Sequence, residues 1–216
     1  KENELEVKRT TGFVSGGVDF FPNERLKKIT AVTKLFYKNW DQEYFEYLCK
    51  RFEIDVKKKV KELSAGMKVK YSLAVAMASR PTLLLLDEPT SGLDPAARDD
   101  LILMFQEFIE DGKHSILFST HITSDLEKCA DYITYIKNGK IIDSTDKESF
   151  KEKYILVNGK TDDLTEELKS KLIGFHQHNF GFEGLLNSED KALAEKCEKA
   201  KPSLEDIMIH LERREA

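Results

Sequence analysis

The chain has 216 residues, enough for one sizeable hydrophobic core and a small appendage. Its net charge of -5, with 34% charged residues, excludes the global positive field of a typical nucleic-acid-binding protein, and no apolar run approaches the roughly eighteen residues of a membrane span. Cys49, Cys129 and Cys197 are widely spaced and fit reduced thiols rather than a metal site, so the composition predicts a soluble or peripheral protein.

The first third of the chain predicts one strand followed by a helical block. A short polar helix end leads into a strand at 10–14, and a Gly-rich loop, "SGGVDFFP", follows. Between residues 24 and 52 the apolar side chains recur at helical spacing, with Asp41 as the expected N-cap of a second helix. Ser64 is the expected N-cap of the next helix, whose apolar face carries Met67 and Tyr71.

The middle of the chain predicts a parallel α/β unit. An apolar strand at 83–86, an amphipathic helix at 96–113 and a second apolar strand at 115–120 follow one another. Ser124 and Glu127 form the pattern of a capping box for another helix, and "YITYIKNGKII" predicts a hairpin that turns at Asn138 and Gly139.

Beyond Phe150 the segments become short, mixed and charged, which indicates an accessory part of the protein. Ser203 and Asp206 are expected to start a final amphipathic helix. His176 and His178 suggest a metal site only weakly, because no third ligand lies nearby in the sequence.

Three polar side chains mark the ends of the two apolar strands in the middle of the chain. Asp87 and Glu88 end the first strand, and His121 follows the second. Ligands of parallel α/β sheets bind at the carboxyl ends of the strands, so we expect these side chains to share a site. One carboxylate can hold Mg²⁺ beside a phosphate, the other can orient or deprotonate a water, and a histidine can donate to a terminal phosphate.

The order and spacing of three motifs resemble those of ATP-binding cassette (ABC) ATPases. "LSAGM" at 63–67 is similar to the signature motif, "LLLLDEPTSGLD" at 83–94 to the Walker B strand and D-loop, and "STH" at 119–121 to the switch histidine. The resemblance covers roughly residues 10 to 150 and implies a P-loop NTPase, RecA-like α/β fold with a parallel-sheet core and a helical subdomain. "FYKNWDQEYF", Met67 and "SLEDI" further resemble the ATPase subunits of bacterial exporters.

The resemblance implies ATP and Mg²⁺ as cofactors and gives each motif residue a role. Asp87 would bind Mg²⁺, Glu88 would be the general base for the attacking water, and His121 would contact the γ-phosphate. In a dimer, Ser64, Ala65 and Gly66 would contact the nucleotide held by the opposite subunit, and Asp94 would link the two subunits.

Two departures from the family pattern concern the signature and the Q-loop. The usual signature has Gly where this chain has Ala65 and Gln where it has Met67. The family places a glutamine in the loop after the first strand, whereas this chain has Ser15, Gly16 and Gly17. These changes bear on the timing of hydrolysis and on its coupling to transport.

The phosphate-binding loop G-x-x-x-x-G-K-[ST] does not occur in the sequence, since "DGKHS" at 111–115 lacks the first glycine. We therefore expect an ABC ATPase without its N-terminal lobe, inactive as this chain alone. Without the strand that feeds the phosphate loop, the strand at 115–120 would have an open apolar edge, which predicts aggregation, swapping or a rearranged dimer.

The resemblance divides the chain into four expected parts: a remnant of the N-terminal lobe with the Q-loop region (1–23), the helical subdomain (24–80), the catalytic α/β lobe (81–150) and a C-terminal accessory segment (151–216). The predicted function is the ATPase subunit of a membrane exporter, cytoplasmic and peripheral on the inner face of the membrane. Its expected partners are a transmembrane permease and a second ABC subunit, without nucleic acid. Two alternatives are a soluble ABC ATPase that acts on ribosomes or DNA, and a catalytically silent module used for dimerisation.

Overall fold

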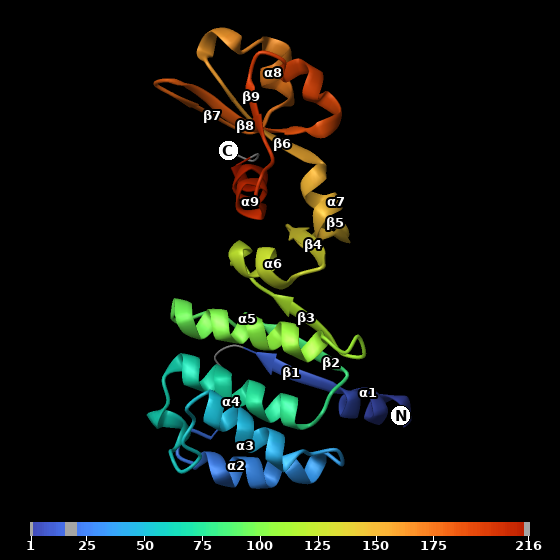
Figure 1. Ribbon diagram of the computed structural model, residues 1–216, viewed down its shortest axis with the longest axis vertical. Helices are drawn as coiled ribbons and strands as arrows, with labels where there is room; N and C mark the ends of the chain where they lie inside the picture. Colours follow the sequence, from blue (N-terminus) through green and yellow to red (C-terminus); the bar gives the residue numbers. More distant parts are fainter. Residues whose placement is uncertain (1, 16–20, 214–216) are drawn as a thin grey trace. The chain divides into compact units, whose positions relative to one another are not determined.

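The computed structural model describes residues 2–15 and 21–213 (Figure 1). The chain divides into two compact units, Lys1–His121 and Ile122–Ala216.

A three-stranded parallel sheet forms the centre of the first unit. After helix α1 (Glu2–Thr10), its strands are β1 (Thr11–Ser15), β2 (Leu83–Asp87) and β3 (Ser115–Ser119), with β2 in the middle. The register aligns Phe13, Leu85 and Leu117 across the three strands. The predicted parallel α/β core is confirmed.

Two helices, α4 (Ala65–Ala78) and α5 (Pro95–Ile109), pack against one face of this sheet (Figure 1). Gly12 permits the close approach of α4, because a Cβ atom there would lie 2.7 Å from Leu84 and 3.4 Å from Ala76. On the α5 side, the rings of Phe105 and Phe118 are 5.9 Å apart. The side chains on this face are therefore closely packed.

On the opposite face of the sheet, apolar side chains are exposed to solvent. Phe13 is 68% exposed and Leu117 is 64% exposed, and both stand in the same row across the strands. A parallel sheet normally buries both faces, so this row is an unusual surface.

The predicted helical block is confirmed as α2 (Leu26–Thr33) and α3 (Gln42–Arg51), with single turns η1 (Lys34–Phe36) and η2 (Val60–Glu62). Asp41 is the N-cap of α3 and accepts the Tyr44 N–H at 2.8 Å. Arg80 lies 2.7 Å from the same carboxylate and stacks 4.0 Å from the centre of the Tyr44 ring. The Tyr44 N–H and then the Arg80 guanidinium lower the pKa of Asp41.

Arg51 joins the helical block to α5. Its guanidinium, which is 18% exposed, donates to Asp100 at 3.0 Å and to Glu107 at 2.6 Å. Two carboxylates of one helix thus hold a single fork-shaped donor, an arrangement that links α3 to α5.

The second unit begins with α6 (Thr123–Cys129) and the hairpin β4 (Tyr132–Lys137) and β5 (Lys140–Asp146), followed by α7 (Lys147–Glu152). The hairpin turn is confirmed, because Asn138 and Gly139 both have positive φ, 50° and 72°. The capping box predicted for Ser124 and Glu127 is wrong. The N-cap of α6 is Ile122, and Glu127 binds instead the Leu204 N–H and the Lys151 ammonium.

An antiparallel sheet in the order β7-β8-β6-β9 follows, a structure that the sequence did not predict. The bounds of this part are β6 (Tyr154–Gly159), η3 (Thr161–Asp163), α8 (Glu166–Lys171), β7 (Ile173–His178), β8 (Gly181–Asn187), η4 (Ser188–Ala194), β9 (Glu198–Ala200) and α9 (Leu204–Glu212).

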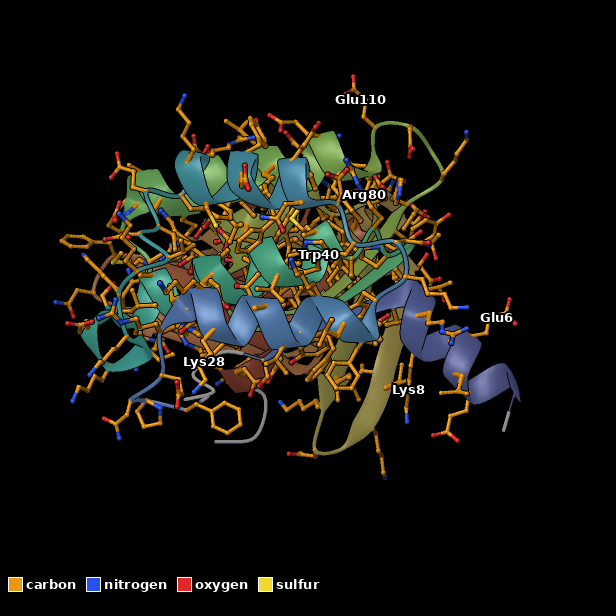
Figure 2. The ribbon with its side chains drawn as sticks, turned by 90° about the horizontal axis from the view of Figure 1, so that it is seen from below. Glu6, Lys8, Lys28, Trp40, Arg80 and Glu110 are labelled. Atoms are coloured by element: carbon orange, nitrogen blue, oxygen red, sulfur yellow. The ribbon has the colours of Figure 1, made fainter. Side chains whose placement is uncertain are left out.

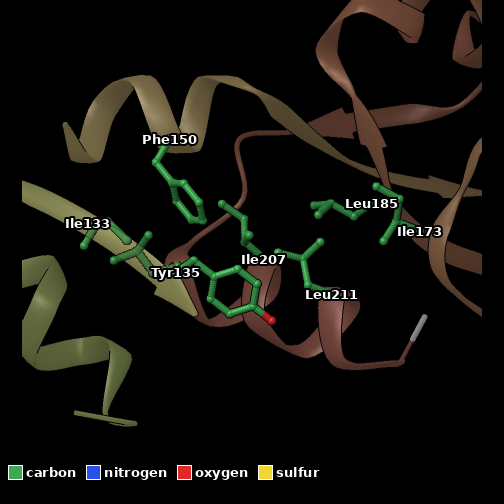
Figure 3. Close-up of a cluster of buried hydrophobic side chains, with 8 residues drawn as sticks. Ile133, Tyr135, Phe150, Ile173, Leu185, Ile207 and Leu211 are labelled. Atoms are coloured by element: carbon green, nitrogen blue, oxygen red, sulfur yellow. The ribbon is translucent and has the colours of Figure 1, made fainter. Parts of the chain in front are cut away.

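The final helix closes a core between the hairpin and this sheet. Ile133 and Tyr135 of β4, Phe150 of α7, and Ile207 and Leu211 of α9 meet in this core (Figure 3). The predicted start of α9 is confirmed, because the Ser203 and Asp206 side chains form a capping box there.

Candidate nucleotide-binding site

The candidate site begins where β2 ends. Asp87 is the last residue of the strand, and Glu88 has a positive φ of 48°. The Glu88 N–H donates to the Ser119 carbonyl oxygen at 3.1 Å, which extends the pairing of β2 with β3 by one residue. A non-glycine residue in the left-handed region is strained by about 1 kcal/mol or more, and such strain concentrates at functional sites.

Ser119 connects both acidic residues. Its hydroxyl donates to Asp87 Oδ1 at 2.6 Å and accepts the Glu88 N–H at 3.3 Å. Sequence reasoning missed this residue as a member of the site. The signal that could have found it is the register, which places Ser119 directly opposite Asp87.

Glu88 and His121 form a second pair. His121 Nδ1 lies 2.9 Å from Glu88 Oε1, while the imidazole side chain is 70% exposed. The other carboxylate oxygen, Oε2, is buried and has no hydrogen-bond partner among the described residues. A buried carboxylate oxygen without a donor costs free energy, so the Glu88 carboxylate retains hydrogen-bonding capacity that the described residues do not satisfy.

These groups fit the Mg²⁺ and attacking water that the family implies. Ser119 engages Oδ1 of Asp87, and the exposed end of the strand leaves the carboxylate accessible to a cation. Residues 2–15 and 21–213 contain no cluster of three or more His, Cys, Asp or Glu side chains placed to bind a metal ion. Mg²⁺ would therefore take most of its ligands from phosphate oxygens and water, as it usually does.

The signature residues form a separate group at the start of α4. Ser64 is the N-cap of this helix, as predicted, and accepts the Met67 N–H at 3.2 Å. Gly66 packs against the D-loop, because a Cβ atom there would lie 2.8 Å from Leu93. The side chains of Ser64 and Ala65 are exposed. The signature therefore presents a hydroxyl and backbone amides outward, as contact with a phosphate requires.

Asp94 is the N-cap of α5, and it accepts the Ala97 N–H at 3.0 Å. This hydrogen bond lowers the pKa of the Asp94 carboxyl, which is exposed. The structure thus gives Asp94 a local role in addition to the subunit contact that the resemblance implies.

Two further predictions concern the Q-loop region and the pair of histidines that the sequence singled out. Gly16 and Gly17 of the Q-loop region fall outside the described residues. His176 and His178 lie on β7, with ring centres 6.4 Å apart, and they belong to no described metal-binding group. Within the described part of the chain no helix has the length and apolar character that a bilayer crossing demands.

Comparison with known proteins gives consistent matches. Residues 20–124 match a family model described as "AAA domain, putative AbiEii toxin, Type IV TA system". The chain is 32% identical to the ABC transporter ATP-binding protein YtrB of Bacillus subtilis over 138 residues, which cover 64% of the chain and 47% of YtrB. It is 43% identical to the lantibiotic transport ATP-binding protein SrtF of Streptococcus pyogenes over 86 residues, 40% of the chain and 37% of SrtF.

The fold also matches a solved structure. The structure titled "Structure of ATP binding subunit of ABC transporter" aligns with a TM-score of 0.62 at 22% identity, over 69% of this chain and 64% of that chain. The chain spans about half the length or less of YtrB and SrtF. The sequence motifs and these relatives agree, and the chain is similar in sequence and fold to the ATP-binding subunits of ABC transporters.

Proposed function

We propose that this chain is part of the ATP-binding and ATP-hydrolysing subunit of an ABC membrane exporter. The observation that carries the proposal is the cluster at the ends of β2 and β3, where Ser119 holds Asp87 and His121 pairs with Glu88. The name of SrtF, a lantibiotic transport ATP-binding protein, supports a role in transport rather than another ABC activity.

In this proposal Glu88 is the general base. Its carboxylate, which the His121 ring holds through Oε1, would accept the proton of the attacking water. His121 orients the carboxylate and, being exposed, can also reach the γ-phosphate. Asp87 would hold Mg²⁺, and a bound Mg²⁺ would supply positive charge beside the phosphate oxygens.

The active form in this proposal is a dimer with a second ABC subunit. Ser64, Ala65 and Gly66 bind the γ-phosphate of the nucleotide on the opposite subunit, and Asp94 lies near the contact. The exposed N-terminus of α4 supports this role, because its amides and positive dipole end favour an anion.

The phosphate cradle has to come from residues that this sequence does not contain. We propose that a phosphate-binding lobe pairs with β3 and covers the open row of Phe13, Leu85 and Leu117. Without backbone amides and a lysine around the phosphates, the 216-residue chain alone is inactive.

The permease contact in this proposal involves the helical block. Leu35 and Phe36 of η1 are 79% and 74% exposed, which is a large apolar surface for two adjacent residues. The subunit would then act on the cytoplasmic face of the membrane, where a closing and reopening dimer drives the permease. A catalytically silent module is the weaker alternative, because Asp87, Glu88 and His121 are all present and arranged together.

Affinity capture from the native membrane fraction, in detergent and with a tag on this chain, tests the proposal. We expect a polytopic membrane protein in stoichiometric amount, and we expect Leu35→Asp with Phe36→Asp to abolish its capture. Stoichiometric ribosomal proteins in place of the membrane protein would instead support the soluble ABC ATPase.

A further inference from the structure

Two basic segments of the first unit lie side by side and form one surface. Four backbone hydrogen bonds join residues 21–28 to residues 55–62. The N–H groups of Leu26, Lys27, Val60 and Lys61 donate across, at 2.9 to 3.1 Å, and two of these bonds make a β-bridge between Arg25 and Lys59. Leu26 and Val60 are buried beneath this junction, with 0% and 4% exposure. The two segments therefore keep a fixed relative position.

This junction concentrates positive charge. We define the basic patch as the seven basic side chains of these segments: Arg25, Lys27, Lys28, Lys57, Lys58, Lys59 and Lys61. Only three acidic residues accompany them, whereas the whole chain carries a net charge of -5. All but Lys59, which is half-buried, are exposed, and Figure 2 shows Lys28 on the outer side of α2. The sequence alone does not bring the two segments together, so either one by itself is an ordinary solvated run.

The acidic neighbours neutralise little of this charge. Glu24 pairs with Lys28 at 2.9 Å, and Lys28 is the only member of the basic patch with an ion-pair partner among the described residues. Asp55 and Glu62 accept backbone N–H groups of Lys57 and Lys59 instead. Six cationic side chains thus have no carboxylate at ion-pair distance in the described part of the chain.

One large apolar side chain stands beside the basic patch. Phe21 is 68% exposed and has a positive φ of 42°, and the Lys61 N–H donates to the carbonyl oxygen of its neighbour Pro22. An aromatic ring beside exposed lysines is the composition of surfaces that bind anionic membranes, where the ring enters the headgroup region and the lysines remain at the lipid phosphates.

We propose that the basic patch and Phe21 bind the anionic lipid surface of the membrane, directly and without the permease. This inference rests on the proposed function, which brings the subunit to the membrane. Single-stranded nucleic acid is the less suitable ligand, because its binding sites stack successive bases on several aromatic rings and Phe21 is the only aromatic residue in the two segments. The contact would orient the cassette before or during its assembly with the permease.

Flotation of the 216-residue chain with lipid vesicles tests this proposal. Vesicles of phosphatidylcholine with 30% phosphatidylserine, at about 0.1 M salt, should carry the protein upward in a density gradient, and pure phosphatidylcholine vesicles should not. Aggregated protein sinks in this assay and is not mistaken for bound protein. About 0.5 M salt should release the protein, because the attraction is screened.

Variants identify the surface. Lys57→Gln with Lys58→Gln and Lys61→Gln should weaken binding about 10- to 100-fold. The matched control is Lys160→Gln with Lys191→Gln and Lys196→Gln, which removes the same charge from exposed lysines of the second unit and should change binding less than about twofold. Phe21→Ala should also weaken binding to the vesicles, and the size of this loss should not depend on the salt concentration, because the contribution of the ring is apolar.

Three results would overturn the inference: equal flotation with neutral vesicles, equal loss in both triple variants, or no flotation together with tight binding of single-stranded RNA that depends on the basic patch. The permease is absent from the assay, so its outcome is independent of the proposed function. A chain that captures a permease but does not float refutes only this inference. One that floats but captures no permease refutes only the exporter assignment.

Discussion

At the scale of single residues, the site depends on how Glu88 is held. Its positive φ of 48° is unfavourable for a glutamate. The residue is nevertheless held in place, because its N–H donates to the carbonyl and hydroxyl oxygens of Ser119 and its carboxylate pairs with the His121 ring. Strain that the surroundings maintain in this way keeps the carboxylate in one position, which would lower the reorganisation needed for the proposed deprotonation of a water.

The first prediction concerns the Ser119 hydroxyl. In a protein that joins this chain to an ABC phosphate-binding lobe, Ser119→Ala should reduce ATP turnover about tenfold and raise the Mg²⁺ concentration for half-maximal rate, because a charge-assisted hydrogen bond to Asp87 is lost. Steady-state assays over a Mg²⁺ series measure both effects.

Two further variants complete this test. Ser119→Thr keeps the hydroxyl and should restore most of the rate. Ser115→Ala, on the exposed first residue of the same strand, is the matched control and should leave both values unchanged. An unaltered Mg²⁺ dependence in Ser119→Ala would show that the hydroxyl does not position Asp87.

The sequence predicted side chains that act on their own backbone better than those that act over long distances. Asp41, Ser64 and Ser203 cap the predicted helices, because each bonds to an amide three residues away. Glu127 was assigned wrongly because its partners, Lys151 and Leu204, are brought to it only by the folded second unit. Ser119 was missed for the same reason, since its role depends on the register of β2 with β3.

At the scale of elements, the link between α3 and α5 depends on Arg51. Arg51→Met should lower the free energy of unfolding by about 1 to 2 kcal/mol, because Asp100 and Glu107 lose a shared donor that is mostly shielded from water. Urea denaturation measures the change. Lys50→Met, at the exposed neighbouring position, is the control and should cost less than about 0.5 kcal/mol. Equal effects in both variants would contradict a specific role of the ion pairs.

The packing of α9 on β7 depends on Gly174. This residue has a φ of 60°, and a Cβ atom there would lie 2.3 Å from the His210 carbonyl oxygen. Gly174→Ala should therefore cost roughly 2 to 4 kcal/mol, since both the backbone and the packing of α9 are disturbed. Gly139→Ala is the matched control, with a φ of 72° and open space around the position, and it should cost about 1 kcal/mol. Thermal unfolding distinguishes the two, and a similar stability of both variants would contradict the predicted clash.

The antiparallel sheet of the second unit could not be predicted from the sequence. Its strands pair β6 with β8 and β9, which are separated along the chain by α8, η4 and other segments. Short strands with charged residues have no periodicity long enough to identify them, and their partners are set by tertiary contacts. The parallel core was predictable because four consecutive leucines and a neighbouring apolar run mark β2 and β3 as buried strands.

At the scale of the whole molecule, the open face of the first sheet should control solubility. Phe13→Lys with Leu117→Lys should raise the monomeric fraction of the 216-residue chain at least severalfold in light scattering with size-exclusion chromatography, because it breaks an exposed apolar row. Ile141→Lys with Phe180→Lys adds the same charge at other exposed apolar positions, 66% and 89% exposed, and should help less. A wild-type chain that is already monomeric would contradict the prediction.

The central proposal is that Glu88 is the catalytic base of an ABC ATPase site. ATP binding and turnover by the 216-residue chain, beside the chain joined to an ABC phosphate-binding lobe and its Glu88→Gln variant, test this claim most directly. We expect no binding or turnover by the chain alone, turnover by the joined protein, and a loss of at least about 100-fold in Glu88→Gln with ATP binding retained. Micromolar ATP binding by the chain alone, or an unchanged rate in Glu88→Gln, would contradict the account.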